Sequence, residues 1–163
     1  MSYQPHILSK STFMYGCQCQ KRLFLHKFNP GLKNPEDDQQ QSIFAAGTNV
    51  GLVAQELFPA GGNAEPPTAY EYHLSVVKTQ EFINTGVEII YEAAFNFNGI
   101  LCAIDILVKE NGKWHGYEVK GSTSIKEQHV MDAAFQYYVI TNAGLDLKDI
   151  SIVHLNNKYV RRC

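Results

Sequence analysis

The sequence has no marked excess of charge of either sign. Its 163 residues include 14 lysines and arginines and 16 aspartates and glutamates, so the formal net charge is only −2. This balance excludes a histone-like wrapping protein, whose affinity for nucleic acid would depend on bulk positive charge. It does not exclude an enzyme that acts on a polyanion, because such an enzyme needs only a local basic track beside an acidic metal site.

Long apolar runs are also missing. No stretch approaches the roughly 18 consecutive apolar residues that a membrane-spanning helix needs. Residues 1–13 contain no basic stretch followed by an apolar run, so no signal peptide is legible. We therefore expect a cytoplasmic protein that has no membrane partner.

Cysteine is scarce, and its spacing does not suggest a disulfide framework. The chain contains Cys17, Cys19, Cys102 and Cys163. The first two are too close in sequence to pair easily, and the other two are distant from them. Without a secretory signal, we expect reduced thiols.

Length and composition predict one compact domain. Hydrophobic residues make up 45% of the chain and charged residues 18%, which is enough apolar material for a core. We interpret residues 1–163 as a single domain, either complete or the N-terminal part of a longer protein.

The residue pattern predicts a three-stranded meander between helices. The expected helices cover residues 9–28, 42–58, 74–85 and 125–142, and the expected strands cover residues 87–97, 100–108, 114–120 and 150–155. Asn98-Gly99 and Asn111-Gly112 separate the first three strands. Asn-Gly pairs favour tight antiparallel turns, because both residues tolerate a positive φ. The resulting fold class is α/β.

Three acidic residues stand on these strands: Glu92, Asp105 and Glu118. Residues two apart on a strand project from the same face, so Glu118 and Lys120 share a face while Val119 points the other way. Asp105 lies between two isoleucines on the preceding strand. A carboxylate in such an apolar strand is costly unless a partner charge or a metal compensates it.

Two carboxylates that converge on one point make a hard-oxygen site suited to Mg²⁺ or Mn²⁺. A neighbouring lysine can orient an attacking water or stabilise the charge that develops on a phosphate. These are the groups that metal-assisted phosphodiester hydrolysis requires. The alternative is a solvated charge pair on the strand, and for Glu92 a solvent-facing edge stays equally open.

The last expected helix carries a polar stripe. His129, Asp132 and Gln136 fall at i, i+3 and i+7, and we expect this stripe to contact substrate. A second stripe, which we expect to pack on the sheet, consists of Val130, Ala134, Tyr137 and Ile140–Thr141. Of the two neighbouring tyrosines, we expect one ring in the core and the Tyr138 ring toward the site.

Asp105, a twelve-residue gap and Glu118-Val119-Lys120 resemble the signature of PD-(D/E)XK nucleases. Gln136 and the tyrosines that follow it are similar to the Gln/Tyr motif of the RecB-like branch, which includes CRISPR-associated RecB-like exonucleases. Nearly the whole chain further resembles an uncharacterised bacterial family of RecB-like proteins. The motifs that carry this likeness are residues 8–11, 19–23, 47–51, 117–120, 132–139, 154–156 and 159–161.

The resemblance implies a restriction-endonuclease-like αβββαβ core with a mixed central sheet. It implies a Mg²⁺- or Mn²⁺-dependent DNA nuclease in repair, recombination or defence. Asp105, Glu118 and the Val119 carbonyl would be metal ligands, Lys120 the catalytic lysine, and Glu92 an auxiliary acid. The residues that would contact DNA or organise the site are Gln136, Tyr138, Asp132 and His129.

Two features depart from the family pattern. RecB-like exonucleases often place a metal-binding histidine four residues after a glycine on an upstream helix, and here that position is Gly51. Iron–sulfur members use one N-terminal and three C-terminal cysteines. Cys19 matches the first, but the sequence ends at Cys163, so we do not expect a cluster.

These departures keep a second interpretation open. The same fold could serve as a catalytically degenerate module that binds nucleic acid or a protein partner. The basic residues near the start, Lys10, Lys21, Arg22 and Lys27, fit either a DNA-facing rim or a solvated helical face. The sequence leaves the oligomeric state and the choice between endonuclease and exonuclease open.

Overall fold

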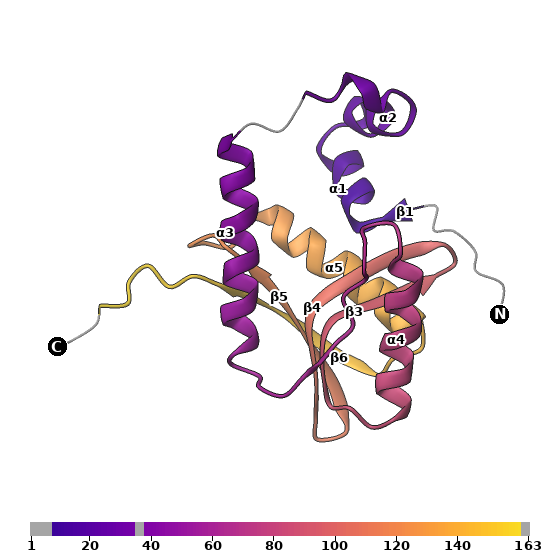
Figure 1. The fold of residues 1–163 in the computed structure, drawn as a ribbon, viewed down its shortest axis with the longest axis vertical. Helices are drawn as coiled ribbons and strands as arrows, with labels where there is room; N and C mark the ends of the chain where they lie inside the picture. Colours follow the sequence, from indigo (N-terminus) through magenta and orange to yellow (C-terminus); the bar gives the residue numbers. More distant parts are fainter. Residues whose placement is uncertain (1–7, 35–37, 161–163) are drawn as a thin grey trace.

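The computed structural model describes residues 8–34 and 38–160 (Figure 1). The described part is an α/β fold with a mixed, open sheet of six strands in the order β2-β3-β4-β5-β6, with β1 beside β4. The strands are β1 (Leu8–Ser9), β2 (Gly62–Asn63), β3 (Ile89–Phe97), β4 (Ile100–Glu110), β5 (Lys113–Lys120) and β6 (Leu147–His154).

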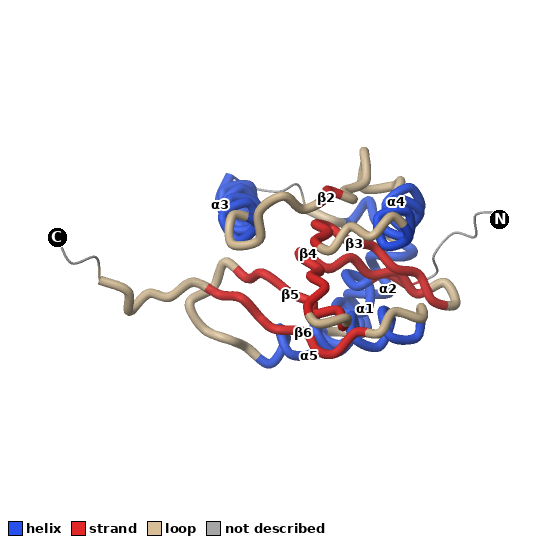
Figure 2. Tube along the Cα trace, turned by 90° about the horizontal axis from the view of Figure 1, so that it is seen from below, coloured by secondary structure: helices blue, strands red, loops and turns tan. Residues whose placement is uncertain are grey.

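Five α-helices in the described residues flank this sheet. They are α1 (Lys10–Gln18), α2 (Gln20–Phe28), α3 (Asp38–Gln55), α4 (Tyr72–Asn84) and α5 (Glu127–Asn142), with a short 3₁₀ turn at Pro30–Leu32. Figure 2 shows α3 and α5 on opposite sides of the sheet. Within the described ranges, no helix has the length and apolar character to cross a membrane.

The predicted meander is confirmed. Strands β3, β4 and β5 pair antiparallel in sequence order. At the two turns, φ is +49° at Asn98 and +77° at Gly99, then +51° at Asn111 and +79° at Gly112. Positive φ at both central residues gives the turn that matches the right-handed twist of the flanking strands. Strand β6 then pairs parallel to β5 after the α5 crossover.

Two expectations about the N-terminal half are wrong. The single helix expected over residues 9–28 is two helices, because the backbone of Cys19 is extended (φ −166°, ψ 118°) and breaks the helix. Strands β1 and β2 were not expected, since two-residue strands are too short to show an alternating pattern. The motif residue Arg161 and Cys163 lie outside the described residues.

The central strands are distorted where the acidic residues lie. Pairing of β3 with β4 passes from Tyr91–Ile106 to Ala93–Ile104 and skips Glu92 and Asp105. Glu92 itself has a φ of +54°, which is rare for a residue with a side chain.

The packing of the core also shows the irregularity of β4. Ile104 packs in the cluster that includes Phe135 of α5, whereas Ile106 packs with Ala54 of α3. Residues two apart normally share a face, so the alternation of β4 breaks at Asp105. Backbone irregularities of this kind re-aim side chains and collect at functional sites.

A substitution at Gly116 tests how tightly β5 packs between β4 and β6. A Cβ there would lie 2.5 Å from Ile104 Cδ1 and 3.0 Å from Ile150 Cγ1. We expect Gly116→Val to lower the free energy of unfolding by about 1–3 kcal/mol, because the added carbons overpack the core. Urea unfolding monitored by circular dichroism measures this. The control Gly31→Ala, where a Cβ meets nothing within 4 Å, should change stability by less than about 0.5 kcal/mol. A Gly116→Val protein as stable as the control would contradict the packing.

Candidate active site

Four of the residues singled out in the sequence meet between β5 and α5. Lys120 Nζ lies 2.5 Å from Glu118 Oε1 and 2.5 Å from Asp132 Oδ2. Gln136 Nε2 donates to Glu118 Oε2 at 2.6 Å and to the Ala103 carbonyl at 3.1 Å. We call this set, together with Lys10, the acidic centre.

Glu118 is the most deeply buried charge of the acidic centre, with 1% of its surface exposed. Burial alone would raise the pKa of its carboxyl. The ammonium groups of Lys10 and Lys120 and the Gln136 hydrogen bond outweigh burial and hold that pKa at about 2. Glu118 is therefore a carboxylate at neutral pH, and its charge is compensated inside the protein.

Lys10 belongs to the acidic centre although 108 residues separate it from Glu118. Its Nζ lies 3.0 Å from Glu118 Oε1 and 3.6 Å from Asp132 Oδ1. It therefore lies neither on a solvated face nor on an outer rim, the two alternatives that its sequence position left open. No periodicity connects the start of α1 with β5, so only the folded chain reveals this contact.

Asp105 lies beside the acidic centre at the distorted point of β4. Its Oδ2 accepts a hydrogen bond of 2.5 Å from the Val119 backbone N–H. Burial, followed by the negative charge of Glu118, raises the pKa of Asp105 to about 6. The structure thus brings Asp105, Glu118 and Lys120 to adjoining positions on β4 and β5.

Glu92 and Asp105 line one cavity of about 530 Å³. Burial raises the pKa of Glu92 to about 7, and the charges of Asp105 and Glu65 add to the increase. Glu92 therefore lines the cavity with a half-buried side chain.

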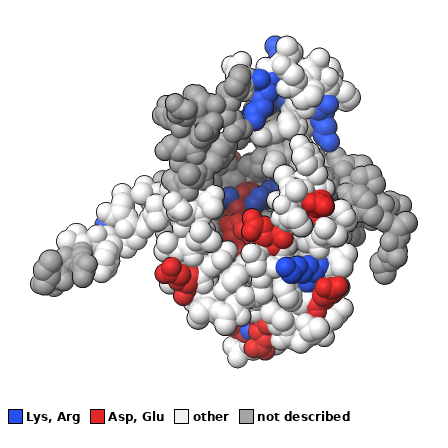
Figure 3. All heavy atoms as spheres, viewed as in Figure 1, with Lys and Arg blue, Asp and Glu red and all other residues white. Residues whose placement is uncertain are grey.

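The cavity walls are acidic. Its lining includes Glu65, Glu92 and Asp105, the Val119 position, Gly47 and Gly51 of α3, and Tyr72 of α4, and the described lining contains no lysine or arginine. Figure 3 shows acidic side chains gathered around a hollow in the middle of this face, with basic side chains beside them. Burial and the charge of Glu92 raise the pKa of the Tyr72 phenol.

Two predicted contact residues lie outside the acidic centre. His129 is buried at the start of α5, where its Nδ1 accepts a hydrogen bond from the Lys126 backbone N–H at 3.3 Å. Tyr138 is half exposed and packs edge-on against Phe97, with 6.2 Å between ring centroids. Tyr138 lines a separate apolar groove that also includes Phe13.

The expectation that a second stripe of α5 packs on the sheet is confirmed for Ile140, which lies in the core, and is wrong for Val130, Ala134 and Tyr137, which are exposed. Tyr138 is exposed as well, so the two tyrosines do not divide between core and site. The polar stripe itself is buried, together with Phe135 and Val139. The reason is that the acidic centre lies between helix and sheet, so polar side chains of α5 find partners there.

The thiols form no ligand set in the described part of the chain. Cys17 and Cys19 are exposed free thiols, and Cys102 is buried and free. Cys163 cannot be placed, since it falls outside the described residues.

The chemistry of the donors suits a hard divalent cation. Among the described residues, no group of three His, Cys, Asp or Glu side chains is assembled to hold a metal ion. The candidate set is two carboxylates, Asp105 and Glu118, with the Val119 carbonyl, and all three are oxygen donors. Burial is the main cause of the raised pKa values of Glu92 and Asp105; the negative charge of Asp105 adds to the increase at Glu92, and that of Glu118 adds to the increase at Asp105. A bound cation would relieve the repulsion.

Comparison with known proteins assigns no family to this chain. No protein-family model matches it, and no curated protein matches it either. Any functional assignment therefore depends on the motifs and on the geometry of the acidic centre.

The raised carboxyl pKa values predict how stability depends on pH without metal. The pKa of Glu92 rises from its usual 4.5 to about 7, so the folded state holds this proton more tightly than the unfolded state. Stability from this group is complete below pH 4.5 and is lost as the pH rises toward 7. With EDTA present, we expect the melting temperature to fall between about pH 5 and about pH 8.

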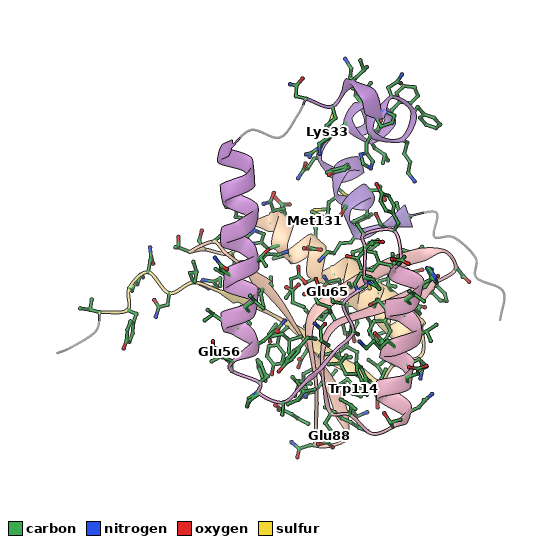
Figure 4. The ribbon with its side chains drawn as sticks, in the orientation of Figure 1. Lys33, Glu56, Glu65, Glu88, Trp114 and Met131 are labelled. Carbon is green, nitrogen blue, oxygen red and sulfur yellow. The ribbon has the colours of Figure 1, made fainter. Side chains whose placement is uncertain are left out.

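Glu92→Gln should reduce this fall and raise the melting temperature at the higher pH. The matched control is Glu88→Gln, an exposed position at the far end of the molecule from the cavity (Figure 4). It should leave the pH profile unchanged. Differential scanning calorimetry at both pH values measures the effect, and identical profiles for the two variants would contradict the burial of Glu92.

Proposed function

We propose that the chain is a Mg²⁺- or Mn²⁺-dependent nuclease of the RecB-like branch of the PD-(D/E)XK superfamily. It would hydrolyse phosphodiester bonds of DNA in repair, recombination or defence. One observation carries the proposal: Asp105, Glu118 and Lys120 adjoin one another where β4 is distorted, and Gln136 holds Glu118 from α5.

The order of elements supports a restriction-endonuclease-like core. A helix precedes the β3-β4-β5 meander, α5 follows it, and β6 returns parallel to β5. This is the αβββαβ order that the sequence resemblance implies. The acidic residues occupy the middle of that core, next to the cavity of about 530 Å³ that Glu92 and Asp105 line.

The electrostatics support a requirement for cations. A DNA phosphate approaching the cavity meets Glu65, Glu92 and Asp105, with no basic residue in the described lining. A cation between the phosphate and the carboxylates would offset this repulsion. Asp105, Glu118 and the Val119 carbonyl would hold this cation, with Glu92 as an auxiliary acid. When bound, it would supply charge neutralisation at the phosphate and a more acidic water.

Each polar residue of the acidic centre has a separate task in this proposal. Lys120 would orient the attacking water and stabilise negative charge on the phosphate, as a positioned ammonium can. Asp132 holds Lys120 in place through the 2.5 Å contact. Gln136 fixes one oxygen of Glu118, so that the carboxylate keeps one orientation. His129 and Tyr138 remain predicted DNA contacts on the flanks of this centre.

A second candidate function is a degenerate nuclease-fold module that binds nucleic acid or a protein. Two observations favour it. Both oxygens of Glu118 already have internal partners, and Gly51, which takes the place of the family's histidine, lines the cavity without a side chain. Metal binding separates the two candidates, because a degenerate module would bind Mn²⁺ weakly or not at all.

Lys120→Ala tests catalysis directly. The assay is cleavage of end-labelled single-stranded and double-stranded DNA with Mg²⁺, Mn²⁺ or EDTA. We expect cutting that depends on the metal and falls at least about 100-fold in the variant, because a preorganised charge at the reacting phosphate is lost. The control is Lys148→Ala, an exposed lysine on β6.

The product pattern would also separate endonuclease from exonuclease activity. If the folded wild-type protein cuts no DNA under any metal, the binding module is favoured. Cutting that survives in Lys120→Ala would remove Lys120 from the proposed mechanism.

Gly51→His tests whether a histidine at this position adds a ligand to the metal site. Gly51 lines the cavity, and a Cβ there meets nothing within 4 Å, so the added side chain begins in open space. We expect Mn²⁺ to bind at least about tenfold more tightly, or by about 1.4 kcal/mol. Isothermal titration calorimetry measures this, with Gly51→Ala as the control for the loss of glycine. Equal affinities in the two variants would show that this position does not face the metal.

A further inference from the structure

Lys10 is held in the acidic centre by the backbone that precedes it. Strand β1 pairs with β4 through Leu8–Ile100 and Ser9–Leu101. Ser9 then caps α1, since its Oγ accepts from the Thr12 N–H while its own N–H donates to Thr12 Oγ1 at 2.8 Å. Lys10 is the first residue after this cap, so its position relative to β4 is fixed on both sides. A flexible surface lysine would have no such support.

Glu118 has no free oxygen while Lys10 is in place. Its Oε1 accepts from Lys120 at 2.5 Å and from Lys10 at 3.0 Å, and its Oε2 accepts from Gln136 at 2.6 Å. Each carboxylate oxygen offers about two lone pairs. Oε1 is thus saturated by two ammonium groups, so a metal ion that binds Oε1 needs one of them to leave, whereas Oε2 keeps one lone pair beside its bond from Gln136.

Lys10 is the ammonium group that is held less tightly. Its contact with Glu118 is 0.5 Å longer than that of Lys120 (3.0 Å against 2.5 Å). Its contact with Asp132 is 3.6 Å, against 2.5 Å for Lys120. Its side chain is also more exposed, 27% against 21%. Exchange with a cation from solvent therefore costs less at Lys10.

We propose that Lys10 is an internal counter-cation of the acidic centre, which a divalent cation must displace in order to bind Oε1 of Glu118. This inference rests on the proposed function, because it concerns the same carboxylates. Lys10 acts through Glu118 and is a positioning residue. It keeps the buried carboxylates neutralised in the metal-free protein, and its charge opposes any second cation at the same oxygen.

The displacement predicts tighter metal binding when the charge of Lys10 is removed. In Lys10→Met we expect Mn²⁺ to bind at least about tenfold more tightly than in the wild type, since a like charge about 3 Å from the ligand oxygen is gone. Lys10→Arg keeps the charge and should show no gain. Lys148→Met removes an exposed lysine and is the control for net charge. Isothermal titration calorimetry with Mn²⁺ alone gives the four affinities.

A second measurement, the melting temperature with and without Mn²⁺, keeps the test valid if Lys10→Met is less stable than the wild type. Lys10→Met should melt at a lower temperature than the wild type in EDTA, because Glu118 and Asp132 then share one ammonium group. Saturating Mn²⁺ should raise its melting temperature more than that of the wild type. This readout holds even where the metal-free variant is partly unfolded, since metal binding is then coupled to folding.

The outcomes separate this inference from the proposed function. Tighter binding by Lys10→Met alone supports the inference, and cleavage by the wild type tests the nuclease independently. If only Lys10→Met binds Mn²⁺, Lys10 is the counter-cation and the native chain is a degenerate module. Equal or weaker binding by Lys10→Met, or an equal gain in Lys148→Met, would overturn the inference while leaving a nuclease possible. Absence of Mn²⁺ binding in every variant would overturn both.

Discussion

Glu118 is a carboxylate almost completely removed from water, and the arrangement around it follows from the need to compensate that charge. An unpaired buried carboxylate costs several kcal/mol, roughly, even after the protein relaxes. Two lysines and one amide meet this cost, and they come from three different elements: α1, β5 and α5. The compensation therefore also ties these elements together. Removal of one partner would leave the others with an unbalanced charge, so the acidic centre behaves as a unit.

The carboxylates of this region are kept in different ionisation states by their surroundings. Glu118 has lysines as neighbours, and its pKa falls to about 2. Asp105 and Glu92 are half-buried beside other acids, and their pKa values rise to about 6 and about 7. Environments that drive the pKa values of nearby acids apart are typical of catalytic and binding sites.

The distortion of β3 and β4 occurs at the acidic residues Glu92 and Asp105 themselves. A regular ladder would place the side chains of Ile104 and Ile106 on the same face, with Asp105 on the other. Instead the two isoleucines pack against α5 and α3 respectively, and Glu92 adopts a positive φ. Because the backbone is irregular there, Glu92 and Asp105 of adjacent strands can lie beside both the acidic centre and the cavity. The two faces of the sheet still pack against α5 and α3.

The sequence alone determined the meander, because Asn-Gly turns and runs of β-branched residues act within a few residues of one another. It also determined that α5 carries a polar stripe at helical spacing. The same reasoning found Asp105, Glu118 and Lys120, since alternation along a strand is a local property. Tertiary structure alone showed that Lys10 contacts Glu118, 108 residues further along the chain. It also showed that the first expected helix ends at Cys19 and a second begins there, and that the polar stripe of α5 faces the sheet. Each depends on which elements pack together, and a buried carboxylate attracts its partners by proximity in space, whatever their separation in sequence.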